Sequence, residues 1–156
     1  MGKALISIGI CINSPFVYGS ETLLLMTVRQ NDLKTAKFLL EHEADPRRPP
    51  EILHAAVMNG NLQLVKLLYD CGARNETRSI WTADKTALQS AASKGQVEIV
   101  CFLLSRGADV NAYARRDGET VLQAAASRGI RELVELVLEY HPNDIYAAVV
   151  TSINAG

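Results

Sequence analysis

An internal repeat constrains the fold of this chain more than any other feature. A block of small or apolar residues with a leucine at one fixed position occurs four times, at residues 22–31, 51–60, 86–95 and 120–129. In each block the leucine stands seven residues before a terminal Gly or Asn, and a second Gly, or a residue in its place, follows twelve residues after that terminus. Four copies in one phase indicate a single structural unit that is built repeatedly, so we predict a row of like units.

Each copy is predicted to form two helices followed by a loop. The first block is rich in alanine in residues 86–95, which favours a narrow helix that neighbouring units can approach closely. The second block, residues 97–104, has apolar residues at helical spacing. Gly95 and Gly107 are expected to end the two helices, because glycine readily adopts the left-handed conformation that helix ends favour. A lone unit cannot bury its apolar face, so the units must stack.

The clearest copy carries a recognisable pattern. Residues 86–111 read Thr-x-Leu-x-x-Ala-Ala-x-x-Gly, then a helix, then Gly-Ala-Asp-Val-Asn. This pattern resembles the ankyrin repeat, whose period is about 33 residues. The family's Thr-Pro-Leu-His is Thr-Ala-Leu-Gln at 86–89 and Thr-Val-Leu-Gln at 120–123, and only His54 keeps the histidine. We expect the glutamines to supply a similar local hydrogen bond. The glutamine variant is also similar to ankyrin arrays of fungal proteins.

The resemblance implies an all-α fold, an ankyrin-repeat solenoid of stacked antiparallel helix pairs with projecting loops. It has about four full repeats plus partial end repeats in one domain, residues 1–156. The phase predicts full repeats at 19–49, 50–83, 84–116 and 117–142 and partial repeats at 4–18 and 143–156. Both ends are apolar, which leaves two alternatives open: the chain is cut from a longer array, or its end repeats associate with those of a second copy.

Composition and charge narrow the function classes. Hydrophobic residues make up 48% and the net charge is −1, so the chain can bury a core and has no overall attraction for nucleic acid or anionic membranes. The apolar stretch near the N-terminus is explained better as the tail of a repeat than as a secretory signal, and no run reaches the ~20 residues of a membrane-spanning helix. The three cysteines form no Cys-x-x-Cys pair, which favours the cytoplasm or nucleus over secretion.

The resemblance also places the partner-binding surface, on the concave face of the first helices and on the projecting loops. It points to the positions just before each terminal Gly or Asn and to aromatic and basic loop residues. The predicted set is Arg29, Met58, Asn59, Arg78, Trp81, Lys85, Lys94, Tyr113, Arg115, Arg116 and Arg128. Trp and Arg are residue types that often dominate interface energetics. The alternative for Trp81 is that it packs back on its own loop.

Charge is distributed unevenly between the two kinds of helix. Basic residues recur at the ends of the first helices, which predicts a basic groove for an acidic partner segment. Acidic residues gather on the second helices, at Glu98, Glu132, Glu135 and Glu139. The alternative is an ordinary solvated surface, on which Asp84, Asp117 and Glu119 neutralise the loops.

Chemistry of other kinds has little support in the sequence. It contains no glycine-rich phosphate loop, and none of its histidines stands at metal-ligand spacing from a Cys or Glu. We therefore predict a non-enzymatic module that binds a protein, with no cofactor, metal, nucleic acid or membrane partner. One alternative is an enzyme or small-molecule-binding protein built on the groove, using Tyr113, Asp117, His54 or Trp81. The other is a structural segment of a larger scaffold with no partner of its own.

Overall fold

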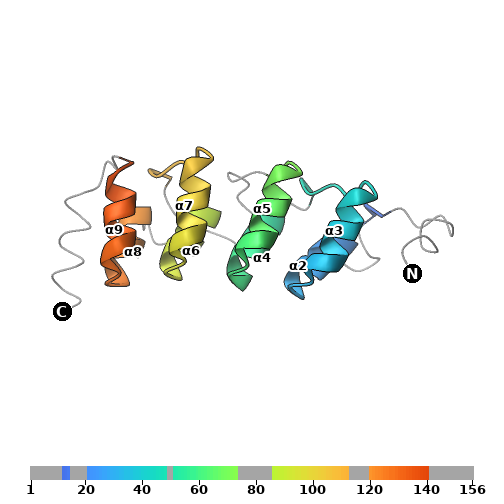
Figure 1. The fold of residues 1–156 in the computed structure, drawn as a ribbon, viewed down its shortest axis with the longest axis horizontal. Helices are drawn as coiled ribbons and strands as arrows, with labels where there is room; N and C mark the ends of the chain where they lie inside the picture. The colour runs from blue at the N-terminus through green and yellow to red at the C-terminus, as the bar shows by residue number, and fades with distance from the viewer. Residues whose placement is uncertain (1–11, 15–20, 49–50, 74–85, 113–119, 141–156) are drawn as a thin grey trace. The chain divides into compact units, whose positions relative to one another are not determined.

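The computed structural model describes residues 12–14, 21–48, 51–73, 86–112 and 120–140. Within these ranges the chain forms eight α-helices and no strand. Figure 1 labels the helices along the chain. The helices are α2 (Leu23–Arg29), α3 (Leu33–Glu41), α4 (Ile52–Asn59), α5 (Leu62–Asp70), α6 (Ala87–Ser93), α7 (Val97–Ser105), α8 (Val121–Ser127) and α9 (Arg131–Leu138). The predicted all-α fold of paired helices is confirmed.

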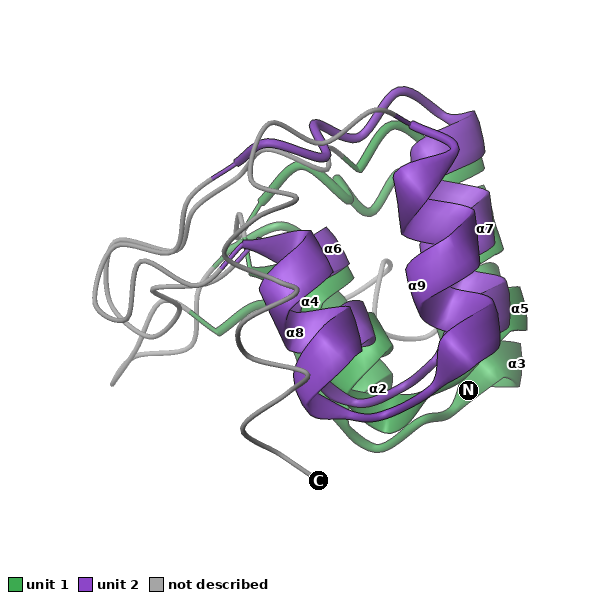
Figure 2. Ribbon diagram, turned by 90° about the vertical axis from the view of Figure 1, so that its left-hand side faces the viewer, with its two compact units in different colours: residues 1–74 green, residues 75–156 purple. Residues whose placement is uncertain are grey.

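The chain divides into two compact units, residues 1–74 (unit 1) and residues 75–156 (unit 2). In unit 1, α2 packs on α3 and α4 packs on α5, and the two pairs meet through α2 with α4 and α3 with α5. Unit 2 repeats this arrangement with α6 and α7, α8 and α9 (Figure 2). First helices therefore pack on first helices and second helices on second helices, as a translational repeat requires. The predicted boundaries of the repeats stay a prediction.

The core of each pair is built on the repeated leucine. Leu24, Leu53, Leu88 and Leu122 are all exposed by 2% or less. One turn further on, Ala56, Ala91 and Ala125 are completely buried in α4, α6 and α8. A leucine fills the space between the two helices of a pair, and a buried alanine lets the next first helix approach closely.

Three of the first helices begin at a threonine. The side chains of Thr22, Thr86 and Thr120 each accept a hydrogen bond of 3.2 Å from the backbone N–H three residues later. Gln89 and Gln123 return the bond by accepting from the backbone N–H of their threonine, at 2.7 and 2.9 Å. This reciprocal capping box occupies two donors that a helix start would otherwise leave unpaired. The local hydrogen bond expected of the glutamines is confirmed.

The first repeat ends its helices without glycine. Asn31 and Glu43 adopt φ angles of 57° and 67°, in the left-handed region where the later repeats place glycines such as Gly60 and Gly72. Asn tolerates this conformation better than most residues. In Glu, the β-carbon comes too close to the following carbonyl oxygen, which strains the backbone. Glu43 is therefore the residue at which the degenerate first repeat is most strained.

Replacing Glu43 with glycine is expected to stabilise the protein by about 0.5–1 kcal/mol, because relief of left-handed strain exceeds the added entropy of the unfolded chain. Urea unfolding followed by circular dichroism measures the effect. Asn31→Gly is the comparison: it relieves less strain and also removes the hydrogen bond that the Asn31 side chain accepts from the Asn61 amide at 2.7 Å, so it should not stabilise the protein. A destabilising Glu43→Gly would show that the glutamate side chain makes contacts that outweigh its strain.

Candidate partner-binding surface

In unit 1, a hydrogen bond joins the ends of the two first helices. Asn59, the last residue of α4, donates from its side-chain amide to the backbone carbonyl of Val28 at 2.6 Å. That carbonyl lies in the last turn of α2, where carbonyls lack a full set of helical partners. Asn59 therefore has a structural role in addition to the partner contact predicted for it. The bond brings the backbone of Met58 and Asn59 beside that of Arg29.

Unit 2 has an equivalent connection made by a different residue. Arg128 follows α8, and its guanidinium Nε donates to the carbonyl of Ser93, the last residue of α6. This hydrogen bond also places the positive charge of Arg128 at the C-terminal end of α6, where the helix dipole favours a cation. Lys94 comes next in the chain and is exposed. The structure thus brings Lys94 and Arg128 together in unit 2, as it does Arg29, Met58 and Asn59 in unit 1.

Arg29 has an acidic partner that the sequence analysis did not include. Its Nη1 forms an ion pair with Oε1 of Glu21, and the two side chains are 50% and 41% exposed. An ion pair this open to water contributes about 0–1 kcal/mol. Glu21 precedes the capping threonine and lies eight residues from Arg29. Ion pairs along a helix join residues three or four apart, so the local sequence did not predict this contact.

Some of the predicted surface residues lie within the described ranges and others lie outside them. Met58 is 47% exposed, the largest value among the exposed large hydrophobic residues of the described ranges. Asn59, Lys94 and Arg128 are also exposed. The loop members of the predicted set lie outside the described residues: Arg78, Trp81, Lys85, Tyr113, Arg115 and Arg116. Whether the whole set meets one partner stays a prediction.

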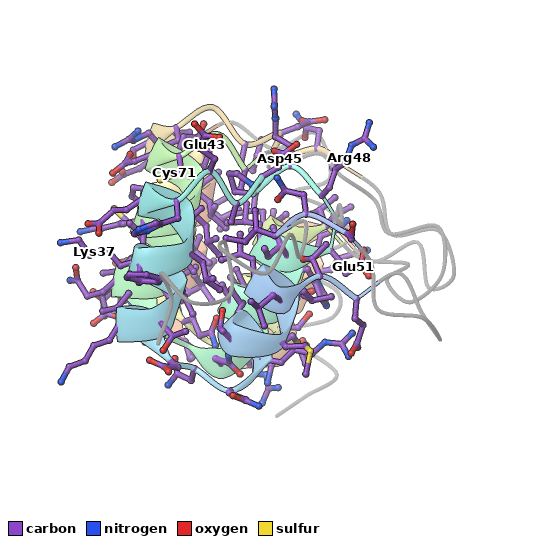
Figure 3. The ribbon with its side chains drawn as sticks, turned by 90° about the vertical axis from the view of Figure 1, so that its right-hand side faces the viewer. Lys37, Glu43, Asp45, Arg48, Glu51 and Cys71 are labelled. Atoms are coloured by element: carbon purple, nitrogen blue, oxygen red, sulfur yellow. The ribbon has the colours of Figure 1, made fainter. Side chains whose placement is uncertain are left out.

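Unit 1 also contains an open hollow of about 420 Å³ at the loop that follows α3. Figure 3 shows Glu43, Asp45 and Arg48 along this loop, with Cys71 near its start. The side chain of Asn13 donates to the carbonyl of Glu43 at 3.0 Å and accepts from the backbone N–H of Asp45 at 2.7 Å. The hollow is lined by Asn13, Glu43, Ala44, Asp45, Pro46, Arg47, Cys71 and Gly72. Sequence reasoning missed it because residue 13 reaches the loop from thirty residues away.

Two titratable side chains that line the hollow, Asp45 and Cys71, have shifted pKa values. Asp45 accepts from the Arg47 guanidinium at 2.9 Å, and this hydrogen bond holds the pKa of the carboxyl below its usual range. Partial burial, together with nearby Asp70, raises the pKa of the Cys71 thiol. A raised pKa keeps the thiol protonated at neutral pH, so Cys71 lacks the thiolate that nucleophilic chemistry needs. Over the described ranges, His, Cys, Asp and Glu side chains form no cluster of three able to hold a metal ion.

The repeat pattern, the helix pairs and their capping threonines agree with a comparison to known families. Residues 23–114 match the family model described as ankyrin repeats in three copies. This chain belongs to the ankyrin repeat family. Ankyrin repeats generally mediate protein–protein interaction and are typically non-enzymatic. The matched range ends before α8 and α9, which nevertheless pack as α6 and α7 do.

Individual relatives are ankyrin proteins of very different length. Protein phosphatase 1 regulatory subunit 27 of Mus musculus is 37% identical over 111 residues, which cover 65% of this chain and 68% of that protein. Its Homo sapiens counterpart is 34% identical over 124 residues, covering 76% and 78%. Ankyrin repeat and SAM domain-containing protein 6 of Rattus norvegicus is 35% identical over 94 residues, covering 60% of this chain but only 10% of that protein. The chain thus spans most of the first two relatives and a tenth of the third.

The length and apolar character of the helices decide whether any of them could cross a membrane. Across the described ranges, no helix combines the length and the apolar character that crossing a bilayer requires.

Proposed function

We propose that this ankyrin chain is a non-enzymatic module that binds a protein partner through the ends of its first helices and its inter-repeat loops. We further propose that a basic groove there receives an acidic segment of the partner. The helix-end set consists of Arg29, Met58, Asn59, Lys94 and Arg128, and the loop set of Arg78, Trp81, Lys85, Tyr113, Arg115 and Arg116. The regulatory-subunit name of the mouse and human relatives supports a role in binding another protein, with protein phosphatase 1 the first candidate to test.

One observation carries this proposal. In both units the structure places exposed basic residues at the end of a first helix: Arg29 in unit 1, Lys94 and Arg128 in unit 2. Arg29 stands two residues before Asn31, whereas Lys94 and Arg128 each stand one residue before a glycine. The second repeat has Met58 and Asn59 at these two positions, so a basic residue lies near the end of the first helix in three of the four repeats. Complementary charge chiefly increases the association rate and the selectivity for an oppositely charged segment.

Exposed thiols support the proposed compartment. Cys71 and Cys101 are free and exposed within the described ranges. Such thiols are typical of a reducing environment, so we propose the cytoplasm or nucleus. Association of a second copy through the end repeats remains a further proposal, and the apolar residues on which it rests, Ile6, Ile8, Ile10, Val149 and Val150, lie outside the described residues. Sedimentation analysis tests it directly.

The acidic-segment proposal predicts a salt-sensitive interaction. A fluorescein-labelled synthetic peptide alternating Glu and Leu should bind more tightly than a matched peptide of Gln and Leu, and its affinity should fall as salt rises. Replacing Lys94 and Arg115 together with glutamine should weaken binding about three- to tenfold, because two favourable charges are lost. Fluorescence anisotropy measures both effects.

The control removes two positive charges from the second helix of the first repeat. Lys34 and Lys37 are exposed on α3, and replacing both with glutamine should leave peptide affinity unchanged. If both double variants weakened peptide binding equally, the effect would come from net charge alone, and this would contradict the proposed basic groove. Turnover of a small molecule that survives the Lys94 and Arg115 changes would favour the enzyme alternative. Absence of any binding to peptide or to protein phosphatase 1 would favour a structural segment.

A further inference from the structure

We propose that Glu21 is a built-in competitor for the partner's carboxylate at Arg29. We infer in addition that the surface around Arg29 and Met58 receives a partner segment with an acidic residue beside a large apolar one. The inference rests on the proposed function and deepens it, because it states the chemistry that unit 1 recognises. Every residue that it uses in the chain is described by the structure.

The structure makes Arg29 and Met58 neighbours. The side-chain amide of Asn59 bonds to the carbonyl of Val28 at 2.6 Å, and these two residues are next in the chain to Met58 and Arg29. The helices that carry them, α2 and α4, pack on each other in unit 1. A cationic side chain and an exposed apolar one are therefore presented from adjoining helix ends.

Apolar residues extend this surface by one helical turn. Met26 lies three residues before Arg29, and Ala55 lies three residues before Met58, so each pair shares a helix face. Both Met26 and Ala55 are partly exposed. Methionine is unbranched and polarisable, which suits it to pack against apolar side chains of different shapes. In unit 2 the positions corresponding to Arg29 and Met58 are Ser93 and Ser127, so the apolar character belongs to unit 1.

The ion pair explains how an acidic partner would engage. Glu21 meets Arg29 through a single nitrogen and a single oxygen, with both side chains roughly half exposed. A guanidinium has five N–H donors and binds carboxylates best through two parallel bonds. A partner carboxylate can therefore replace Glu21 at little cost, because so exposed a pair is held weakly. Until it does, Glu21 neutralises Arg29 and selects against segments that offer charge without apolar contact.

Removing the competitor should strengthen binding. Glu21→Gln is expected to tighten the complex with the Glu and Leu peptide about threefold or more, since Arg29 is freed and a repelling charge is lost. Arg29→Gln should weaken the same complex. In the Arg29→Gln background, Glu21→Gln should have a much smaller effect, because the two residues act on one carboxylate. Met58→Ser should weaken binding of both the Glu and Leu and the Gln and Leu peptides.

The matched control is Glu41→Gln, which removes the same charge from the exposed end of α3. It should leave the affinity unchanged. The inference would be overturned if Glu41→Gln tightened binding as much as Glu21→Gln does. It would also be overturned if Glu21→Gln tightened binding equally in the Arg29→Gln background. In either case the effects of the Lys94 and Arg115 changes would still support the proposed function. A dimer that Met58→Ser dissociates would assign this surface to a second copy and overturn the inference too. Absence of peptide binding by every variant would overturn both proposals.

Discussion

Replacing Leu122 with alanine is expected to lower the free energy of unfolding by about 3–5 kcal/mol. Leu122 is 1% exposed in α8, which packs on α6 and on α9 in unit 2. The truncation removes buried apolar surface and leaves a cavity that the flanking helices can close only in part. Urea unfolding followed by far-ultraviolet circular dichroism measures the loss.

Leu138→Ala in the same unit is the control for this change. Leu138 ends α9 and is 38% exposed, so the same truncation should cost less than about 1 kcal/mol. The contrast separates burial from the loss of leucine itself. Similar losses for both variants would show that Leu122 is not the internal anchor that the repeat makes it.

The second large effect is expected at Gln89, a buried polar residue with two structural bonds. Its side chain is 1% exposed and accepts from the backbone N–H of Thr86 at 2.7 Å. Its amide nitrogen also donates to the backbone carbonyl of Ala112, in the segment after α7. Gln89→Ala leaves a donor and an acceptor without this partner, so we expect a loss of about 2–4 kcal/mol in unfolding free energy.

Two further variants make this prediction specific. Gln123→Ala removes the equivalent capping bond to Thr120 from a less buried residue, so it should cost about 1 kcal/mol. Gln89→His restores the residue typical of the family, and one imidazole nitrogen can accept while the other donates. It should therefore recover part of the stability lost in Gln89→Ala. A loss no larger for Gln89→Ala than for Gln123→Ala would show that the bond to Ala112 adds nothing.

Several features were predictable because they depend on residues close together in the chain. The alanine-rich pattern of residues 86–95 predicted a narrow helix that its neighbours approach closely, and six of the seven residues of α6 are buried. The glutamines at the family's histidine position predicted a local hydrogen bond, and the structure shows it as the bond that Gln89 accepts from the backbone N–H of Thr86. Glycine spacing predicted where helices end, and the same phase identified Glu43 as the substitute whose left-handed φ of 67° the structure records. Each of these patterns involves residues close together in the chain, and it occurs in more than one repeat.

The contacts at the candidate surface were not predictable in the same way. The bond from Asn59 to Val28 spans 31 residues and that from Arg128 to Ser93 spans 35. Each depends on how two helices align, and different residue types make the equivalent connection in the two units. Sequence reasoning took Asn59 and Arg128 only as partner contacts, because a polar residue at a helix end looks alike whether it meets a neighbouring helix or a partner.

By itself, the sequence determined the helix pairs, their ends and the anchoring leucines of the core, because these follow from the period and from glycine spacing, and the motif at residues 86–111 indicated the family by resemblance. Only the tertiary structure decided that Asn59 ties α4 to α2, that Asn13 reaches the loop after α3, and that Arg29 is paired with Glu21. The physical reason is that a side chain's partner is set by the register and spacing of packed helices. Periodicity identifies which face of a helix is exposed, whereas packing determines what that face meets.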